Sequence, residues 1–214
     1  MKKSLWIGYV LALLTFSAWT QTNDAKNESL DAQNRYAEDR ITMQLVSGPF
    51  LSDTGIGPNV NEYNYVQNNL RVGWILNTPG AEDNPLRGSW EAIGELSGSV
   101  VVSSYGDLMV GPTALLRYNF VQPNWVVIPY IQGGAGVVYN DGYEVKSQRA
   151  LGQAFEFTPQ VSVGMRCLVD ENWSVDFEGM YHHISNACMA DRNAGVNAFG
   201  GMIGCTYFFD NLWK

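Results

Sequence analysis

Short runs in which apolar and polar residues alternate recur along this chain from Ile41 to Phe209. The clearest run covers Ala154–Leu168. Successive side chains of a β-strand point to opposite faces, so such a run predicts a strand with one apolar and one polar face. The apolar face carries Phe155, Phe157, Val161, Val163, Met165 and Cys167, and the polar face carries Glu156, Thr158, Gln160, Ser162 and Arg166. A chain assembled from such runs is expected to be all-β.

Eight runs of this kind follow one another, separated by segments rich in Gly, Pro, Asn and Asp that are typical of turns. They cover Ile41–Phe50, Tyr63–Asn77, Gly88–Val102, Leu108–Phe120, Trp125–Asn140, Ala154–Leu168, Trp173–Ser185 and Gly195–Phe209. Eight strands can close into a small barrel, and closure removes the unpaired edges of the sheet. The sequence therefore predicts an eight-stranded antiparallel β-barrel.

The distribution of charge indicates which face of this barrel is inside. The charged members of the polar faces are Arg71, Glu91, Glu95, Arg117, Glu156, Arg166, Asp176 and Glu178. The opposite faces are apolar and carry aromatic residues near the strand ends, for example Trp125 and Tyr139. Such a surface is typical of a transmembrane barrel of the outer-membrane type, whose lumen is polar and whose charges pair inside. The alternative is a soluble, lipocalin-like barrel, in which the charged face would point to water.

The composition supports export to a membrane. Only 16% of the residues are charged, and no stretch after the N-terminus reaches the roughly 18 apolar residues of a membrane helix. Lys2-Lys3 followed by the apolar run Leu5–Phe16 is typical of a signal peptide. We expect a signal peptide at 1–20, a polar periplasmic lead at 21–40, the barrel at 41–209 and a short tail at 210–214. The net charge of -8 argues against a nucleic-acid partner.

Loop lengths indicate the orientation of the barrel. The turns Val121–Asn124 and Asp170–Asn172 are short, as periplasmic turns are, whereas Asp141–Gly152 is longer, as external loops are. With both termini in the periplasm, the loop after the seventh strand is external. His183 and Ser185 continue the apolar face of that strand, so we expect both side chains to point outward near the outer leaflet.

The segments His183–Ala187 and Asn193–Asn197 resemble the lipid A 3-O-deacylase (PagL) family. Leu116–Pro123 and Gly152–Phe155 resemble the broader group of acyloxyacyl hydrolase-like outer-membrane barrels, so the resemblance covers most of the chain after the lead. It implies an eight-stranded barrel in the bacterial outer membrane that hydrolyses an ester-linked acyl chain of lipid A. It also implies that the substrate is lipopolysaccharide of the outer leaflet and that neither a cofactor nor a metal takes part.

The resemblance also implies roles for individual residues. Ser185 is the nucleophile and His183 the general base, because a serine hydroxyl is weakly nucleophilic until a base takes its proton. The oxyanion hole falls on the Asn193 side chain and the backbone N–H of Cys188, where this chain replaces a glycine of the family. The acid of the triad falls on Asn197, an amide that can orient the imidazole but cannot stabilise imidazolium as a carboxylate does.

Alternatives to this assignment remain open. Asp191, in the loop, is a conceivable substitute for the acid at position 197. A carboxylate placed at 197 is expected to raise the rate, glutamate more than aspartate because its longer arm matches the family's acid. The rival function is a structural or adhesion barrel that is weakly active or inactive and keeps the motif, which Asn197 favours. The oligomeric state stays open, a homodimer included.

Two further groups of residues are expected to have structural roles. By parity we expect His182 to face the lumen, which argues against a metal site shared with His183, because adjacent strand residues point apart. The cysteines are Cys167, Cys188 and Cys205, and an odd number in an exported chain leaves at least one thiol unpaired. Their spacing does not suggest a zinc site.

Overall fold

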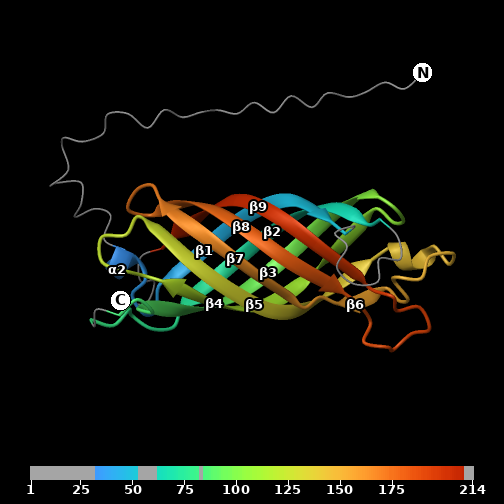
Figure 1. The fold of residues 1–214 in the computed structure, drawn as a ribbon, viewed down its shortest axis with the longest axis horizontal. Helices are drawn as coiled ribbons and strands as arrows, with labels where there is room; N and C mark the ends of the chain where they lie inside the picture. The colour runs from blue at the N-terminus through green and yellow to red at the C-terminus, as the bar shows by residue number, and fades with distance from the viewer. Residues whose placement is uncertain (1–31, 53–61, 82–83, 210–214) are drawn as a thin grey trace, which may run out of the picture.

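The computed structural model describes residues 32–52, 62–81 and 84–209, which form a closed antiparallel barrel (Figure 1). The strands are β1 (Ile41–Leu51), β2 (Asn64–Ile75), β3 (Gly88–Ser103), β4 (Leu108–Phe120), β5 (Val127–Asn140), β6 (Phe155–Phe157), β7 (Gln160–Leu168), β8 (Trp173–Ile184) and β9 (Val196–Phe208). A short helix, α2 (Ala32–Arg35), and a 3-10 turn, η1 (Gly142–Glu144), complete the described elements. None of the described helices is long and apolar enough to cross a membrane.

The barrel closes because β1 pairs with β9 and β4 pairs with β5. β6 and β7 both pair with β5 and occupy one position in the wall, so the wall has eight strands as predicted. Sequence alternation predicted one unbroken strand here. The break falls at Thr158-Pro159, because proline has no N–H to donate to a neighbouring strand. Side-chain alternation nevertheless continues across the break, with Phe157 exposed and Gln160 buried.

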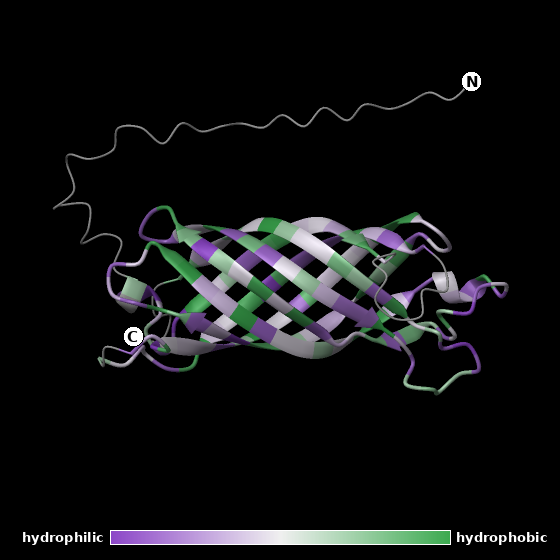
Figure 2. Ribbon diagram, viewed as in Figure 1, coloured by the Kyte–Doolittle hydropathy of each residue, from purple (hydrophilic) through white to green (hydrophobic). Residues whose placement is uncertain are grey.

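Hydrophobic and hydrophilic residues alternate along the strands of the barrel (Figure 2). The apolar side chains of the strands are largely exposed on the outside, and the polar ones are buried inside. Residues predicted to face lipid are exposed: Phe155, Val161, Val163, Phe199 and Ile203. All eight charged residues predicted to face the lumen are at most 4% exposed. This arrangement confirms the outer-membrane type of barrel and contradicts the lipocalin-like alternative, in which the charges would be in water.

Aromatic pairs form a band on the outer wall near each end of the strands. At the end near α2, Trp173 packs against Tyr207 with ring centroids 5.0 Å apart. At the opposite end, Tyr181 packs against Phe199, also at 5.0 Å. Amphipathic rings favour the level of the lipid headgroups, so the two bands mark the upper and lower limits of the apolar wall.

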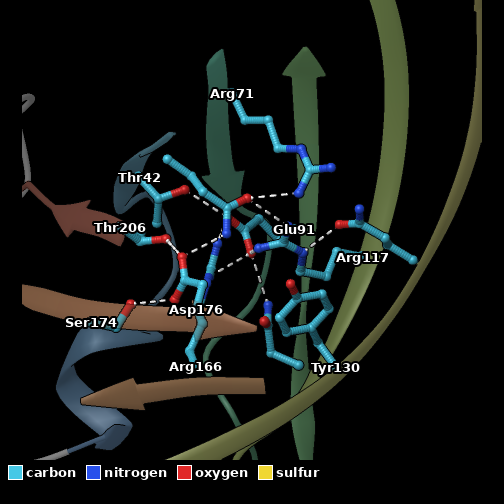
Figure 3. Close-up of polar contacts among 12 residues, drawn as sticks. Thr42, Arg71, Glu91, Arg117, Tyr130, Arg166, Ser174, Asp176 and Thr206 are labelled. Carbon is cyan, nitrogen blue, oxygen red and sulfur yellow. Dashed lines mark hydrogen bonds and ion pairs between the residues drawn. The ribbon is translucent and has the colours of Figure 1, made fainter. Parts of the chain in front are cut away.

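The middle of the lumen is filled by a buried network of charges (Figure 3). Arg71 of β2 donates two hydrogen bonds to Glu178 of β8, at 2.7 and 3.0 Å, and one to Glu95 at 2.6 Å. Arg166 likewise donates two hydrogen bonds to the carboxylate of Glu91, at 3.0 and 3.3 Å, so this pair is also bidentate. Buried charges are stable only when they are paired and hydrogen-bonded, and these pairs join β2, β3, β7 and β8 across the lumen.

Apolar clusters close the lumen on either side of this network. At the end near α2, Tyr36 is fully buried and packs edge-on against Phe208, 5.4 Å away. The segment 21–40 was expected to be a polar lead outside the barrel. Ala32 and Tyr36 of this segment are instead buried in the apolar cluster at this end of the lumen. At the opposite end, Phe50 and Tyr65 stack at 5.0 Å beneath the longer loops. The expected signal peptide and residues 21–31 lie outside the described residues.

Candidate active site

His183, Ser185 and Asn197 contact one another on the outer wall. They lie where β8 ends and β9 begins, at the end of the barrel that is opposite α2 in Figure 1. His183 on β8 is paired directly with Asn197 on β9. Strand parity turns both side chains outward, together with that of Ser185 just beyond the end of β8. All three are partly exposed, and the cluster lies where the apolar wall meets the longer loops.

The imidazole of His183 bridges the other two side chains. Its Nε2 lies 3.0 Å from the Ser185 Oγ, and its Nδ1 lies 2.6 Å from the Asn197 Oδ1. An amide oxygen only accepts hydrogen bonds, so Nδ1 must carry the proton. Nε2 then has a free lone pair directed at the serine hydroxyl. This is the tautomer that a general base for Ser185 requires.

The backbone of Ser185 is held by the short strand β6. Its N–H donates to the Phe157 oxygen at 3.0 Å, and its oxygen accepts from the Phe157 N–H at 2.7 Å. The N–H of His183 donates to the Pro159 oxygen at 3.0 Å. The interrupted strand thus fixes both catalytic candidates. The alternation pattern gave no signal for this pairing, because it joins segments far apart in the sequence.

The loop after Ser185 brings the predicted oxyanion donors together. Ala187 and Cys188 have positive φ angles of 52° and 64°, which turn the chain sharply back. The Asn193 side chain spans the turn, since its Oδ1 accepts from the Asn186 N–H at 2.8 Å and its Nδ2 lies 3.5 Å from the Cys188 sulfur. Across the described residues the N–H of Cys188 has no protein acceptor, which leaves it free for a substrate oxygen.

Arg192 ties this loop to the loop between β5 and β6. Its guanidinium donates to the backbone oxygens of Tyr143, Val145 and Gln148 at 2.8 to 3.2 Å. Next to it, the N–H of Ala194 donates to the Arg149 oxygen at 3.0 Å. The two loops that follow β5 and β8 are therefore joined beside the serine. This role could not be predicted from the sequence, because an arginine in a polar loop is ordinarily solvated.

Gly195 is a second residue whose role the sequence did not reveal. Its φ of 72° lies in the left-handed region, which glycine adopts without strain. A side-chain carbon at this position would lie 3.3 Å from the His183 ring and 3.7 Å from the Ser185 Cβ. Gly195 therefore allows the chain to turn tightly over the histidine and the serine.

A shallow groove of about 490 Å³ runs down the outer wall from this cluster. Tyr181, His183 and Asn197 form one side, and Gly134, Pro159, Gln160 and Val161 form the other. An extended apolar chain in this groove would have its end next to His183.

The remaining candidates lie elsewhere. His182 is 3% exposed inside the lumen, where its Nδ1 lies 2.7 Å from the Tyr65 hydroxyl, as parity predicted. Asp191 is exposed in the loop, and the His183 Nδ1 faces Asn197 instead. The three cysteines are unpaired. Within the described residues no group of three or more His, Cys, Asp or Glu side chains could hold a metal ion.

Comparisons with known proteins agree with this architecture. The family model described as lipid A 3-O-deacylase (PagL) matches residues 68–206, more than half of the chain, whereas no curated protein matches. The crystal structure of the outer membrane enzyme PagL is 16% identical and covers 76% of this chain and 97% of its own, with a TM-score of 0.49. The N-terminal β-barrel domain of Pseudomonas aeruginosa OprF is 12% identical and covers 80% and 98%, with a TM-score of 0.52. The OprF likeness concerns the fold alone.

Proposed function

Because this chain belongs to the lipid A 3-O-deacylase (PagL) family, we propose that it is a serine esterase of the bacterial outer membrane that hydrolyses an ester-linked acyl chain of lipid A. The observation that carries the proposal is the contact of 3.0 Å between the His183 Nε2 and the Ser185 Oγ on the lipid-facing wall. A nucleophile at this level meets lipid esters where they lie, beneath the headgroups.

In the first step Ser185 attacks the carbonyl carbon of the ester. His183 takes the hydroxyl proton on Nε2 as the Oγ–C bond forms, and then gives that proton to the departing alcohol oxygen of the sugar. The acyl group remains on Ser185 until water attacks its carbonyl carbon and gives a proton to the same Nε2. The bond between that carbon and Oγ then breaks, Nε2 returns the proton to Oγ, and the fatty acid leaves. Proton transfer by a positioned base of this kind contributes roughly 10²–10⁴-fold to the rate.

The negative charge that develops on the carbonyl oxygen needs donors. We assign this role to the Asn193 Nδ2, which lies 3.5 Å from the Cys188 sulfur, and to the N–H of Cys188 in the sharp turn at Ala187 and Cys188. Removing one such donor typically costs about 2.7–4 kcal/mol in the barrier. Arg192 and Gly195 hold the backbone that carries these donors, so they act by positioning.

Asn197 orients the imidazole of His183 but contributes no negative charge. Its oxygen keeps the proton on Nδ1, so Nε2 can act as the base. The imidazolium that forms during attack faces a neutral amide, which stabilises it less than a carboxylate would. We therefore propose an active enzyme whose chemical step is slower than that of a relative with an acid at this position.

The groove below His183 is the proposed place of the scissile acyl chain. Its lining is largely apolar, and the ester at its upper end would lie next to Ser185. Lipid A in the outer leaflet would present its chains to this wall from the side. The acyl chain is already in an apolar environment before it binds, so the groove adds little to the affinity for lipid A. Its main contribution would be to position the ester beside Ser185.

Mass spectrometry of lipid A from membranes that contain or lack the protein tests the proposal. We expect a species lighter by one acyl chain only when the wild-type protein is present. Ser185→Ala is the matched control, since it removes one oxygen and leaves the barrel unchanged. Identical lipid A spectra for wild type and Ser185→Ala, with both proteins folded in the membrane, would refute the esterase.

A structural barrel without activity is the second candidate, and the amide at position 197 favours it. The two candidates differ in a simple observation. A structural barrel gives the same trace of fatty acid from lipid A and from phospholipid, and it does so with or without Ser185. The esterase releases fatty acid from lipid A in a manner that depends on Ser185.

A further inference from the structure

Tyr181 lies two residues before His183 on the same face of β8, and its hydroxyl donates to the Asn197 Oδ1 at 2.7 Å. The same oxygen accepts from the His183 Nδ1 at 2.6 Å. The chain of contacts thus has four members, running from Tyr181 through Asn197 and His183 to Ser185. We propose that Tyr181 is a positioning residue that keeps the oxygen of the Asn197 amide turned toward His183.

The need for such a residue follows from the chemistry of an amide. A carboxylate presents equivalent oxygens, so either can accept the Nδ1 proton. The Asn197 amide has one oxygen and one NH₂ group, and a rotation of 180° exchanges them. With the NH₂ group toward His183, Nδ1 must accept, the proton moves to Nε2, and the base for Ser185 is lost. The wrong tautomer in a serine triad lowers kcat by about 10⁴-fold.

Tyr181 favours the productive orientation because its O–H needs an acceptor. Within the described residues, the Asn197 oxygen is the only hydrogen-bond acceptor of this hydroxyl. If the amide rotated, the phenol proton would face the apolar wall without a partner, which is costly at a partly buried site. The ring itself is held by Phe199 across the strand pair, with ring centroids 5.0 Å apart. The hydroxyl, held in a fixed position, therefore favours the amide orientation in which the Asn197 oxygen faces it and His183.

This inference rests on the proposed function for its effect on rate, but its effect on the imidazole can be measured separately. The chain has only 2 histidines. In a His182→Gln background, nitrogen-15 NMR of the protein in detergent micelles therefore reports on the His183 ring alone. We expect the form with the proton on Nδ1 when Tyr181 is present. Tyr181→Phe should give a mixture of the two tautomers, and Tyr181→Phe combined with Asn197→Asp should restore the Nδ1 form.

The rates should follow the same pattern. Tyr181→Phe is expected to lower kcat for lipid A about 10-fold with KM within about 2-fold, as for the loss of a hydrogen bond that acts in the chemical step. In the Asn197→Asp background the same substitution should change kcat by less than about 2-fold, because both oxygens of a carboxylate can accept the Nδ1 proton. Tyr139→Phe is the matched control, since Tyr139 belongs to a similar aromatic pair with Phe155 at the same end of the barrel.

The possible results separate the two proposals. An unchanged His183 spectrum in Tyr181→Phe overturns the positioning role, and so does an equal loss of kcat in both backgrounds. If wild type is no more active than Ser185→Ala, the proposed esterase fails, while the spectrum still decides whether Tyr181 orients the amide.

Discussion

The His183 Nδ1 and the Asn197 Oδ1 face each other across the β8–β9 pair at 2.6 Å, a contact that joins an imidazole to an amide where a carboxylate would be expected. Asn197, at the position where the resemblance implies an acid, therefore lies in direct contact with the imidazole. The effect of an amide at this position can be measured.

We predict that Asn197→Asp raises the rate of lipid A deacylation. The carboxylate stabilises the imidazolium that forms as Ser185 loses its proton, a gain of a few kcal/mol or on the order of 10²-fold. The resemblance favours Asn197→Glu, because the longer arm of glutamate matches the family's acid. The Asn197 side chain already reaches the His183 Nδ1, however, so the extra methylene of glutamate would have to be accommodated. Turnover of lipid A in detergent micelles checks this, and a folded Asn197→Asp protein slower than wild type contradicts it.

The two adjacent histidines make a matched pair of variants. His183→Gln should lower kcat at least 10²-fold, because it removes the base, and should leave the melting temperature nearly unchanged. His182→Gln should do the reverse, since His182 contacts Tyr65 in the lumen and does not face Ser185. Fatty-acid release and thermal unfolding, measured side by side, test this. Equal effects of both variants on the rate would argue against catalysis by His183.

We predict that Arg192→Ala loosens the external loops without unfolding the barrel. The substitution removes three hydrogen bonds that join residues 185–195 to the loop after β5. Limited proteolysis should cut both loops faster, and kcat should fall more than KM rises, because the proposed oxyanion donors lose their support. Arg149→Ala is the control: it makes the same change of charge in an exposed side chain. Equal proteolysis of the two variants would contradict the role of Arg192.

Inside the barrel, Arg71→Met should be strongly destabilising. It leaves Glu95 and Glu178 buried without their cation, a loss of about 3–5 kcal/mol in the free energy of unfolding. Adding Glu178→Met should recover part of that loss, because the second charge no longer has to be buried. Urea unfolding of the barrel in lipid vesicles measures both. Leu70→Ala, on the lipid-facing side of the same strand, is the control and should cost much less.

Much of this architecture could be predicted because a strand has only two faces. Parity alone assigned Arg71 and Glu178 to the lumen, Val161 and Phe199 to lipid, and His182 to the side opposite His183. The first strand was expected to begin at Ile41, and β1 begins there. Alternation is a local property, so it works wherever one face is lipid and the other is polar.

Contacts between distant segments could not be predicted in this way. Tyr36 enters the barrel from a segment whose composition suggested only a polar lead, because its burial depends on a space that the closed strands create. The two backbone hydrogen bonds between Phe157 and Ser185 form only because β6 lies beside the end of β8. The bond from Tyr181 to Asn197 depends on register, and a slip of the strands by one residue would abolish it.

The pairing of Arg71 with Glu178 has a consequence for how the protein is assembled. Arg71 lies on β2 and Glu178 on β8, 107 residues later, with β1 and β9 between them in the sheet. The arginine has this partner only after β8 has been added, so a partly built barrel would carry an incompletely neutralised cation into an apolar bilayer. Insertion into the membrane and closure of the wall should therefore happen in one concerted event, and a chain truncated before β8 should remain at the membrane surface.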